Sequence, residues 1–131
     1  MQPVVQRSRS VAITFALVGA SAVVLGAAGA HALHLDARAT GIWQTAVGYH
    51  FWHALAFSVA AFAAPRGRAR RVALCAFVVG MLLFCGSLYA LALGAPSQLG
   101  MLTPIGGVAF VIGWLALASS LGRHAVPSGA P

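Results

Sequence analysis

Apolar residues dominate four long stretches of the chain, and short polar segments separate them. The stretches cover residues 11–30, 43–64, 72–94 and 104–121, and none of them contains Asp, Glu, Lys or Arg. A helix rises about 1.5 Å per residue, so each stretch approaches or exceeds the roughly 30 Å thickness of the hydrocarbon layer. The pattern predicts an all-α membrane protein with four transmembrane helices.

Small residues recur every three or four positions within the stretches. The glycines of these stripes are Gly19, Gly26, Gly80, Gly94, Gly106 and Gly113. Lipid tails are as apolar as Leu, so helices associate in membranes through close packing, which small residues permit. A mean spacing near 3.5 predicts left-handed crossings, and short connections predict antiparallel neighbours. We therefore expect a compact antiparallel four-helix bundle that packs through small-residue stripes.

The second stretch carries polar groups on its predicted inward face. Thr45, Tyr49 and His53 share that face with Ala56 and Ala60. Successive helical residues are about 100° apart, so His50 lies about 60° from His53 and is predicted to flank the stripe. Polar groups at membrane depth usually face protein or a water-filled cavity.

The 131 residues correspond to one domain, and their basic charge follows the ends of the apolar stretches. All eight basic residues are Arg, the only acidic residue is Asp36, and the formal net charge is +7. Nucleic-acid binding proteins place such charge along one exposed face, whereas membrane proteins place it beside their spans. The pattern indicates membrane topology and a lipid bilayer environment, with no nucleic-acid partner.

The distribution of Arg predicts the orientation. The lead (1–10) contains two Arg, the tail (123–131) one, and the segment between the second and third stretches four: Arg66, Arg68, Arg70 and Arg71. Only Arg38 lies on the other side. The positive-inside rule places the lead, this segment and the tail in the cytoplasm. An organellar inner membrane is an alternative, but the lack of a longer presequence favours a bacterial inner (plasma) membrane.

The first stretch has two interpretations. Ala30-His31-Ala32 has the small-x-small form of a signal-peptidase site. The apolar region of a secretory signal is typically about 7 to 15 residues long, and this stretch has twenty. We favour a retained helix, so that residues 11–122 form one four-span domain.

Polar side chains are expected in the outer half of the membrane. The candidate polar cluster comprises His31, Thr45, Tyr49, His53 and Ser87. In one interpretation, His53 makes a single hydrogen bond that fixes helix packing. In the other, His31 and His53, with or without His50, line a pocket that binds a transition metal or haem, or that passes protons.

The two cysteines, Cys75 and Cys85, are not expected to react with each other. Ten residues separate them on one predicted helix, which corresponds to about 15 Å along its axis. That distance is too long for a disulfide. We expect both to be buried apolar thiols.

Catalysis and secondary transport lack their usual residues. The chain has one carboxylate, in a loop, and no nucleophile, base and orienting group at a recognisable spacing. No stretch carries a charged coupling residue, and none is broken in the way typical of transporter helices. We expect no enzyme activity and no cofactor.

Four segments together resemble a known family. They are AAGAHAL around His31, WQTAVGYHFWHALAF at 43–57, LLFCGSLYALAL at 82–93 and LGMLTPIGGVAFVIGWLALA at 99–118. They resemble the small four-span proteins of the YgdD/YwdK type, domain of unknown function 423, a family that includes the vertebrate transmembrane protein 256. The resemblance covers nearly the whole chain and implies an inner-membrane protein without an established activity.

Two positions depart from the pattern that the resemblance implies. His50 stands where the family pattern has Gln, and Cys85 where it has Ser. The first departure makes His50 a weaker candidate than His31 or His53 for a shared role, and the second makes Cys85 a poor candidate for redox chemistry.

The sequence leaves two hypotheses about function. The first is a structural, accessory or interaction role, either beside a membrane-protein partner or as a homo-oligomer. The second is a His-based module that binds or conducts a metal ion, haem or protons through His31 and His53.

Overall fold

The computed structural model describes residues 9–122, which are helical over most of their length. The elements are α1 (Arg9–His31), α2 (Ala37–Phe62), α3 (Arg68–Gly80), the π-helical turn η1 (Met81–Cys85), α4 (Gly86–Ala92), the 3-10 segment η2 (Ser97–Met101) and α5 (Leu102–Gly122). No strand occurs between residues 9 and 122, which confirms the all-α prediction. The predicted tail (123–131) and all of the predicted lead (1–10) except Arg9 and Ser10 lie outside the described residues.

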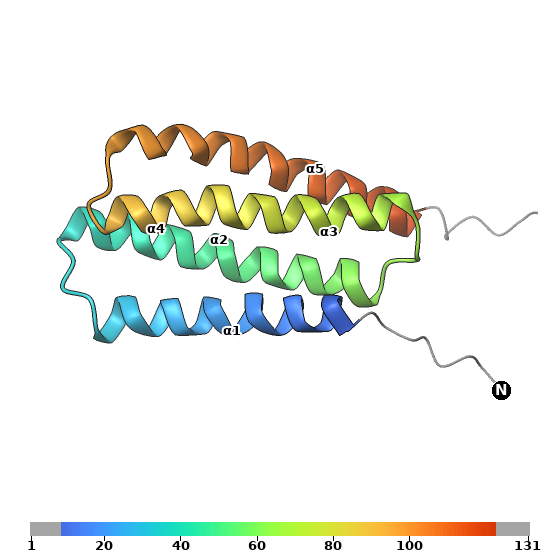
Figure 1. Cartoon of the computed structure of the whole chain (residues 1–131), viewed down its shortest axis with the longest axis horizontal. Coiled ribbons are helices and arrows are strands. Elements are labelled where there is room, and N and C mark those ends of the chain that lie inside the picture. The colour runs from blue at the N-terminus through green and yellow to red at the C-terminus, as the bar shows by residue number, and fades with distance from the viewer. Residues whose placement is uncertain (1–8, 123–131) are drawn as a thin grey trace, which may run out of the picture.

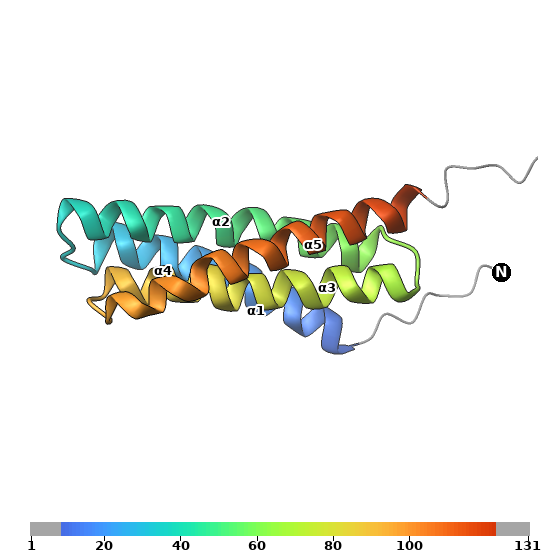
Figure 2. The same ribbon diagram turned by 90° about the horizontal axis from the view of Figure 1, so that it is seen from above.

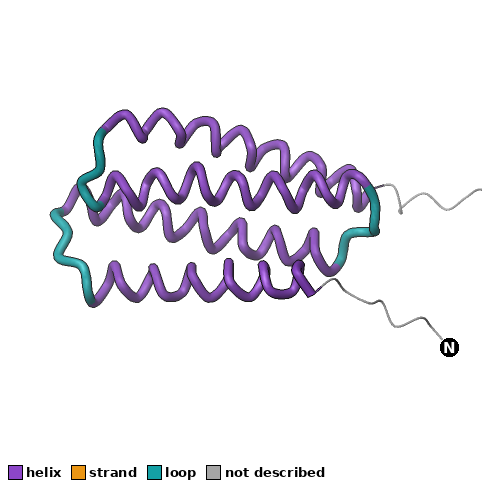
Figure 3. Tube along the Cα trace, in the orientation of Figure 1, coloured by secondary structure: helices purple, strands orange, loops and turns teal. Residues whose placement is uncertain are grey.

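The helices lie side by side as long rods (Figure 1). Helices α3, η1 and α4 follow one another directly and form one continuous rod. Consecutive rods run antiparallel, and the loops are confined to the two ends (Figure 3). Seen from above, α5 runs obliquely across α3 (Figure 2). The antiparallel order agrees with the expectation from the short connections.

Three helical segments are long and apolar enough to cross a membrane. They are Arg9–His31, Arg68–Ala92 and Ser97–Gly122. Helix α2 has 26 residues but is not among them, because polar residues such as Gln44, His50 and His53 interrupt its apolar sequence. By length and composition, three of the four predicted spans are supported.

Helix α2 begins earlier than the apolar pattern predicts. The predicted stretch starts at residue 43, whereas α2 starts at Ala37. The Asp36 side chain accepts a hydrogen bond from the Ala39 N–H at 2.8 Å. This is a helix N-cap, which satisfies one of the free N–H groups of the first turn. A prediction based on apolar content alone missed these two turns.

Helix α2 lies at the centre of the fold, and α1 lies at its edge. Helix α2 packs against α1 and α5 and against both parts of the α3–α4 rod. The described core includes Ala56, Phe57 and Ala60 of α2 with Ala73 and Phe77 of α3. Within residues 9–122, α1 comes close to α2 alone. The arrangement is therefore more open than the compact bundle that we expected.

Three of the predicted stripe glycines lie where α5 meets the α3–α4 rod. A Cβ added to Gly80 or Gly113 would run into the rings of Phe110 or Phe77. A Cβ added to Gly106 would meet the backbone of Phe84. Small residues at these positions allow the two rods to approach closely.

The other three stripe glycines differ from the prediction. Gly26 makes only an ordinary contact, with Val47, and a Cβ at Gly19 or Gly94 would meet no atom within 4 Å. Gly94 has a different role, because its φ of +88° lies in the left-handed region that favours glycine at a helix end. Beside it, the Ala95 N–H bonds to the Ala90 carbonyl at 3.0 Å and closes α4.

On α1, the buried side differs from the predicted stripe. The spacing of Gly19 and Gly26 also places Ala12, Ala16 and Val23 on the predicted stripe, but these three residues are exposed, and the buried residue is Ala22. The small-residue spacing identified a face without identifying which helix covers it. Since α1 packs on a single neighbour, most of its surface remains outside the protein interior.

The third rod buries residues of the predicted stripe together with residues beside it. Gly80 and Ser87 of the predicted stripe lie on either side of η1, and both are buried. Ala73, Leu74, Phe77, Met81 and Cys85 are buried as well. The rod packs against both α2 and α5, so more than one of its faces is covered.

Candidate functional site

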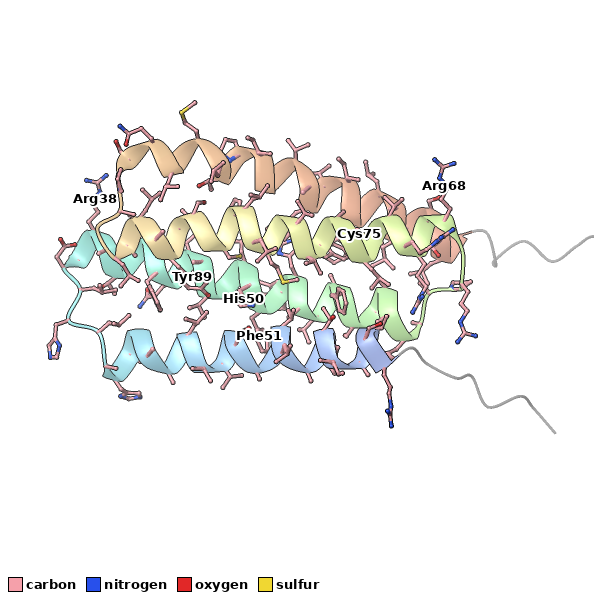
Figure 4. The ribbon with its side chains drawn as sticks, in the orientation of Figure 1. Arg38, His50, Phe51, Arg68, Cys75 and Tyr89 are labelled. Carbon is pink, nitrogen blue, oxygen red and sulfur yellow. The ribbon has the colours of Figure 1, made fainter. Side chains whose placement is uncertain are left out.

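Four side chains form a polar network between α1, α2 and α4. We call Ser21, Trp43, His50 and Tyr89 the His50 network. His50 is 8% exposed, and its Nε2 lies 3.3 Å from Ser21 Oγ. Its Nδ1 lies 3.2 Å from the Tyr89 hydroxyl. The imidazole therefore joins the first helix to the α3–α4 rod, and His50 and Tyr89 lie near each other in Figure 4.

The direction of each hydrogen bond in the network follows from the number of protons available. Ser21 donates its only hydroxyl proton to the Val18 carbonyl at 3.0 Å. Ser21 must therefore accept from His50, so Nε2 carries a proton. In a neutral ring, Nδ1 is then the acceptor, and Tyr89 donates to it. Tyr89 thus donates to His50, His50 donates to Ser21, and Ser21 donates to the Val18 carbonyl, where this row of hydrogen bonds ends.

Trp43 joins the C-terminal part of α1 to the N-terminal part of α2. Its Nε1 donates to the Leu25 carbonyl at 2.9 Å, and its ring meets Tyr89 edge-on with centroids 4.7 Å apart. The ring lies so close to Gly29 that a Cβ there would overlap it. Glycine at position 29 thus makes room for a buried tryptophan whose N–H has a partner.

His53 has a separate environment that faces α5. Its Nδ1 lies 2.7 Å from the Tyr49 carbonyl, which can only accept, so Nδ1 is the donor. Trp114 Nε1 donates to His53 Nε2 at 3.3 Å. The ring stacks on Phe110 with a centroid distance of 3.5 Å. Both nitrogens are occupied, and a metal ion would have to displace Trp114 to bind here.

Ser87 and Thr103 connect α4 to α5. Ser87 donates to the Phe84 carbonyl at 2.9 Å, and its Oγ lies 2.7 Å from Thr103 Oγ1. Since Ser87 has given its proton to Phe84, Thr103 is the donor. Within residues 9–122, no buried side-chain nitrogen or oxygen lacks a hydrogen-bond partner.

The predicted polar cluster does not gather at one place. His53 stacks with Tyr49, whereas Ser87 bonds to Thr103. Thr45 is exposed and donates to the carbonyl of Gly41 in its own helix at 2.9 Å.

The two histidines of the metal or haem hypothesis lie at different depths. His31 is exposed at the last residue of α1. Its neighbour Gly29 packs against Trp43, and His53 lies ten residues beyond Trp43, about 15 Å along α2. The described residues contain no group of three or more His, Cys, Asp or Glu side chains that could hold a metal ion.

Sequence reasoning underestimated His50 and missed its partners. The buried residues Trp43, Ala46, His50 and His53 follow steps of three and four along α2. This spacing was visible in the sequence, but a second stripe ran through Thr45, Tyr49 and His53. Because α2 has neighbours on several sides, more than one stripe is buried, and His50 and His53 face different helices.

The Arg-rich end and the cysteines also have defined environments. Arg70 donates to the carbonyls of Ala60 and Ala61 at 3.0 and 2.9 Å, which satisfies the last turn of α2. Arg66, Arg68 and Arg71 are exposed.

The two cysteines differ in their environments. Cys85 is buried but Cys75 is exposed, so the expectation that both are buried is wrong for Cys75.

The chain has clear relatives. Residues 25–107 match the family model described as "Protein of unknown function (DUF423)". A UPF0382 membrane protein of Haemophilus influenzae is 42% identical over 106 residues, covering 79% of this chain and 86% of the relative. YwdK, a UPF0382 membrane protein of Bacillus subtilis, is 42% identical over 102 residues, covering 73% and 82%.

The Escherichia coli relative carries a more specific description. YgdD, a UPF0382 inner membrane protein, is 37% identical over 115 residues, covering 82% of this chain and 85% of the relative. No solved structure matches the chain. The family resemblance seen in the sequence is confirmed.

Proposed function

Because this chain belongs to the DUF423 family of membrane proteins, we propose that it is a four-span inner-membrane protein with a structural or accessory role. The match covers the end of α1, all of α2, the α3–α4 rod and the first turns of α5. In this proposal, the protein has no catalytic site and acts beside a membrane-protein partner or a second copy of itself.

The position of α2 supports a fourth crossing. Helix α2 lies between α1 and the α3–α4 rod and is as long as they are. Its buried polar side chains, His50 and His53, are bonded to neighbouring helices and not presented to lipid. Polar residues become tolerable at membrane depth when they are paired in this way. A helix of mixed composition can therefore cross the bilayer at this place.

The proposed orientation has both termini in the cytoplasm. Arg66, Arg68, Arg70 and Arg71 occur at one end of the rods, and Arg38 is found at the other (Figure 4). Excess Arg marks the cytoplasmic side. A reporter fused after Arg71 should give a cytoplasmic signal and one fused near Ser97 an external signal. The reversed pair would contradict the orientation, and equal signals would contradict the span between them.

The proposal of a structural role rests on the hydrogen-bond partners of the buried polar side chains. In the His50 network and around His53, every ring nitrogen already has a protein partner. Such bonds contribute on average about 0.6 kcal/mol each in membrane proteins and help to fix which helices meet. The side chains act as connections between α1, α2, α4 and α5.

Proton passage is the second candidate, and it rests on the row of hydrogen bonds Tyr89–His50–Ser21, which ends at the Val18 carbonyl. A proton-flux measurement on purified protein in liposomes, with a pH gradient across the membrane, distinguishes the structural role from proton passage. A structural role predicts the proton leak of empty liposomes, whereas a conducting row predicts a leak that His50→Gln abolishes. An absorbance spectrum and metal analysis of the same preparation test the ligand hypothesis. A Soret band or a stoichiometric metal would contradict the structural role.

A further inference from the structure

A groove runs along the outer surface between α3 and α5. The groove is shallow and largely open to its surroundings, with a volume of about 770 Å³. Its lining residues are Arg68, Arg71, Val72, Cys75, Ala76, Val79, Ala109 and Ile112. Two guanidinium groups therefore stand at one end of the groove, and the other lining residues are apolar or a thiol.

The two arginines are available to a ligand. Arg68 and Arg71 are three residues apart, so they share one face of the first turn of α3. Both are exposed, and neither guanidinium group has a hydrogen bond or ion pair with another described residue. Arg70, on another face, is occupied by the last carbonyls of α2. The Arg68 side chain projects away from the rods in Figure 4.

The length of the groove matches one leaflet of a bilayer. Arg68 and Val79 are eleven residues apart, which corresponds to about 16 Å along a helix. The hydrocarbon layer is roughly 30 Å thick, so the groove covers about half of it. Val72, Cys75 and Val79 are exposed along this length, as Ile112 is on the facing helix. A ligand here needs an anionic group at the membrane surface and an apolar chain beneath it.

We propose that this groove binds one anionic phospholipid, with its phosphate at Arg68 and Arg71 and an acyl chain along Val72, Cys75 and Val79. Arg pairs well with phosphate because its planar group donates two parallel hydrogen bonds. Basic sites between transmembrane helices on the cytoplasmic side are typical places for anionic headgroups. The site depends on α3 crossing the membrane, and only the choice of leaflet depends on the proposed orientation.

Native mass spectrometry of the full chain in neutral detergent tests this site. Phosphatidylglycerol and phosphatidylcholine with identical dioleoyl chains serve as probes, because they share the chains and differ only in the headgroup, which is anionic in the first and zwitterionic in the second. Each Arg near an anionic lipid surface strengthens binding by an amount that corresponds to about a fivefold change in affinity. The R68Q/R71Q double variant should therefore bind phosphatidylglycerol about 30-fold more weakly. The wild-type protein should retain one phosphatidylglycerol in preference to phosphatidylcholine.

Two further variants separate this site from general charge effects. R38Q removes one charge at the opposite end of the rods and should leave lipid binding unchanged. Cys75→Phe fills the groove without altering charge and should weaken the binding of phosphatidylglycerol by roughly tenfold. Inorganic phosphate should not displace the lipid, because it lacks the chain.

Several results would overturn the site. Equal retention of the two lipids would show that the headgroup is not recognised. Unchanged binding in R68Q/R71Q would show that the two arginines do not hold the phosphate. R38Q removes one charge and R68Q/R71Q two, so a free-energy loss in R38Q half as large as that in R68Q/R71Q, or larger, would attribute the effect to net charge. Tight binding by Cys75→Phe would remove the groove. All four results are independent of the topology reporters and of proton flux, so they leave the proposed function standing.

Discussion

Replacing Gly106 with Ala should push α5 away from the rod that it packs against. The added Cβ would lie 2.8 Å from the Cα of Phe84 and closer still to the Phe84 backbone nitrogen. Real Cβ atoms essentially never approach other atoms within 3.0 Å. The atoms in the way belong to the backbone of η1, so no side-chain rotation can relieve the overlap. The helices themselves must move.

The size of the effect follows from that movement. Restoring ordinary contact, at 3.4 Å or more, requires the helices to separate locally by roughly 1 Å. A gap of 0.5–1 Å forfeits about a quarter to a half of the dispersion energy of each contact that it opens. Close packing is a main source of helix association in membranes. We expect a loss of about 1–3 kcal/mol in the free energy of unfolding, the usual range for overpacking.

Gly107→Ala is the matched control. The nearest atoms to a Cβ at Gly107 belong to the Phe84 side chain, 3.8 and 3.9 Å away, which is ordinary contact. Both substitutions gain the same higher helix propensity of Ala, so the difference between them isolates the overlap. A titration with a denaturing detergent, monitored by tryptophan fluorescence, gives the free energy of unfolding of each variant. Equal stability of the two variants would refute the close approach of α5 to η1.

Two further predictions concern α1 and α5. Gly29→Ala should displace the Trp43 ring, break its hydrogen bond to α1 and cost about 1–2 kcal/mol in the same titration, whereas Gly19→Ala, with open space around it, should cost nothing. A loss at position 19 equal to that at position 29 would show that α1 is turned differently. Trp114→Phe removes the donor to His53 Nε2 and should lower the free energy of unfolding by about 1 kcal/mol; an unchanged value would argue against that bond.

The face of α5 was partly predictable from the sequence. The small-residue spacing placed Gly106, Ala109, Gly113, Ala116 and Ser120 on one face. Gly106, Gly113 and Ser120 are buried, but the other buried residues are Phe110 and Leu117 and not Ala109 and Ala116. Helix α5 packs mainly on one rod, so one stripe describes it. Periodicity succeeds where a helix has a single packing face.

The environments of α1 and α2 were harder to predict, for opposite reasons. Helix α2 has neighbours on several sides, so both His50 and His53 are buried although they point toward different helices. Helix α1 has one neighbour, so its stripe of small residues had no second helix to fix its rotation. The partners of His50, Ser21 and Tyr89, come from segments 29 and 39 residues away, and no local spacing reveals such pairings.

The π-helical turn also escaped prediction. It lies in the sequence MLLFC, which is ordinary apolar helix by composition. Phe84 of this turn lies against Gly106 of α5. This is a contact between two helices, which the composition of a single segment does not reveal.

The stability of two variants at position 50 tests most directly whether the His50 network is structural. The Gln amide has a carbonyl oxygen that can accept from Tyr89 and an NH₂ group that can donate to Ser21, as the two imidazole nitrogens do. It is also the residue that the family resemblance implies at this position. Leu offers neither group and leaves the Tyr89 hydroxyl without its acceptor.

We predict that His50→Gln keeps the free energy of unfolding within about 0.5 kcal/mol of wild type, while His50→Leu loses about 1–2 kcal/mol. A loss in His50→Gln as large as in His50→Leu would show that the protein needs the imidazole itself, and would contradict a role limited to joining the helices.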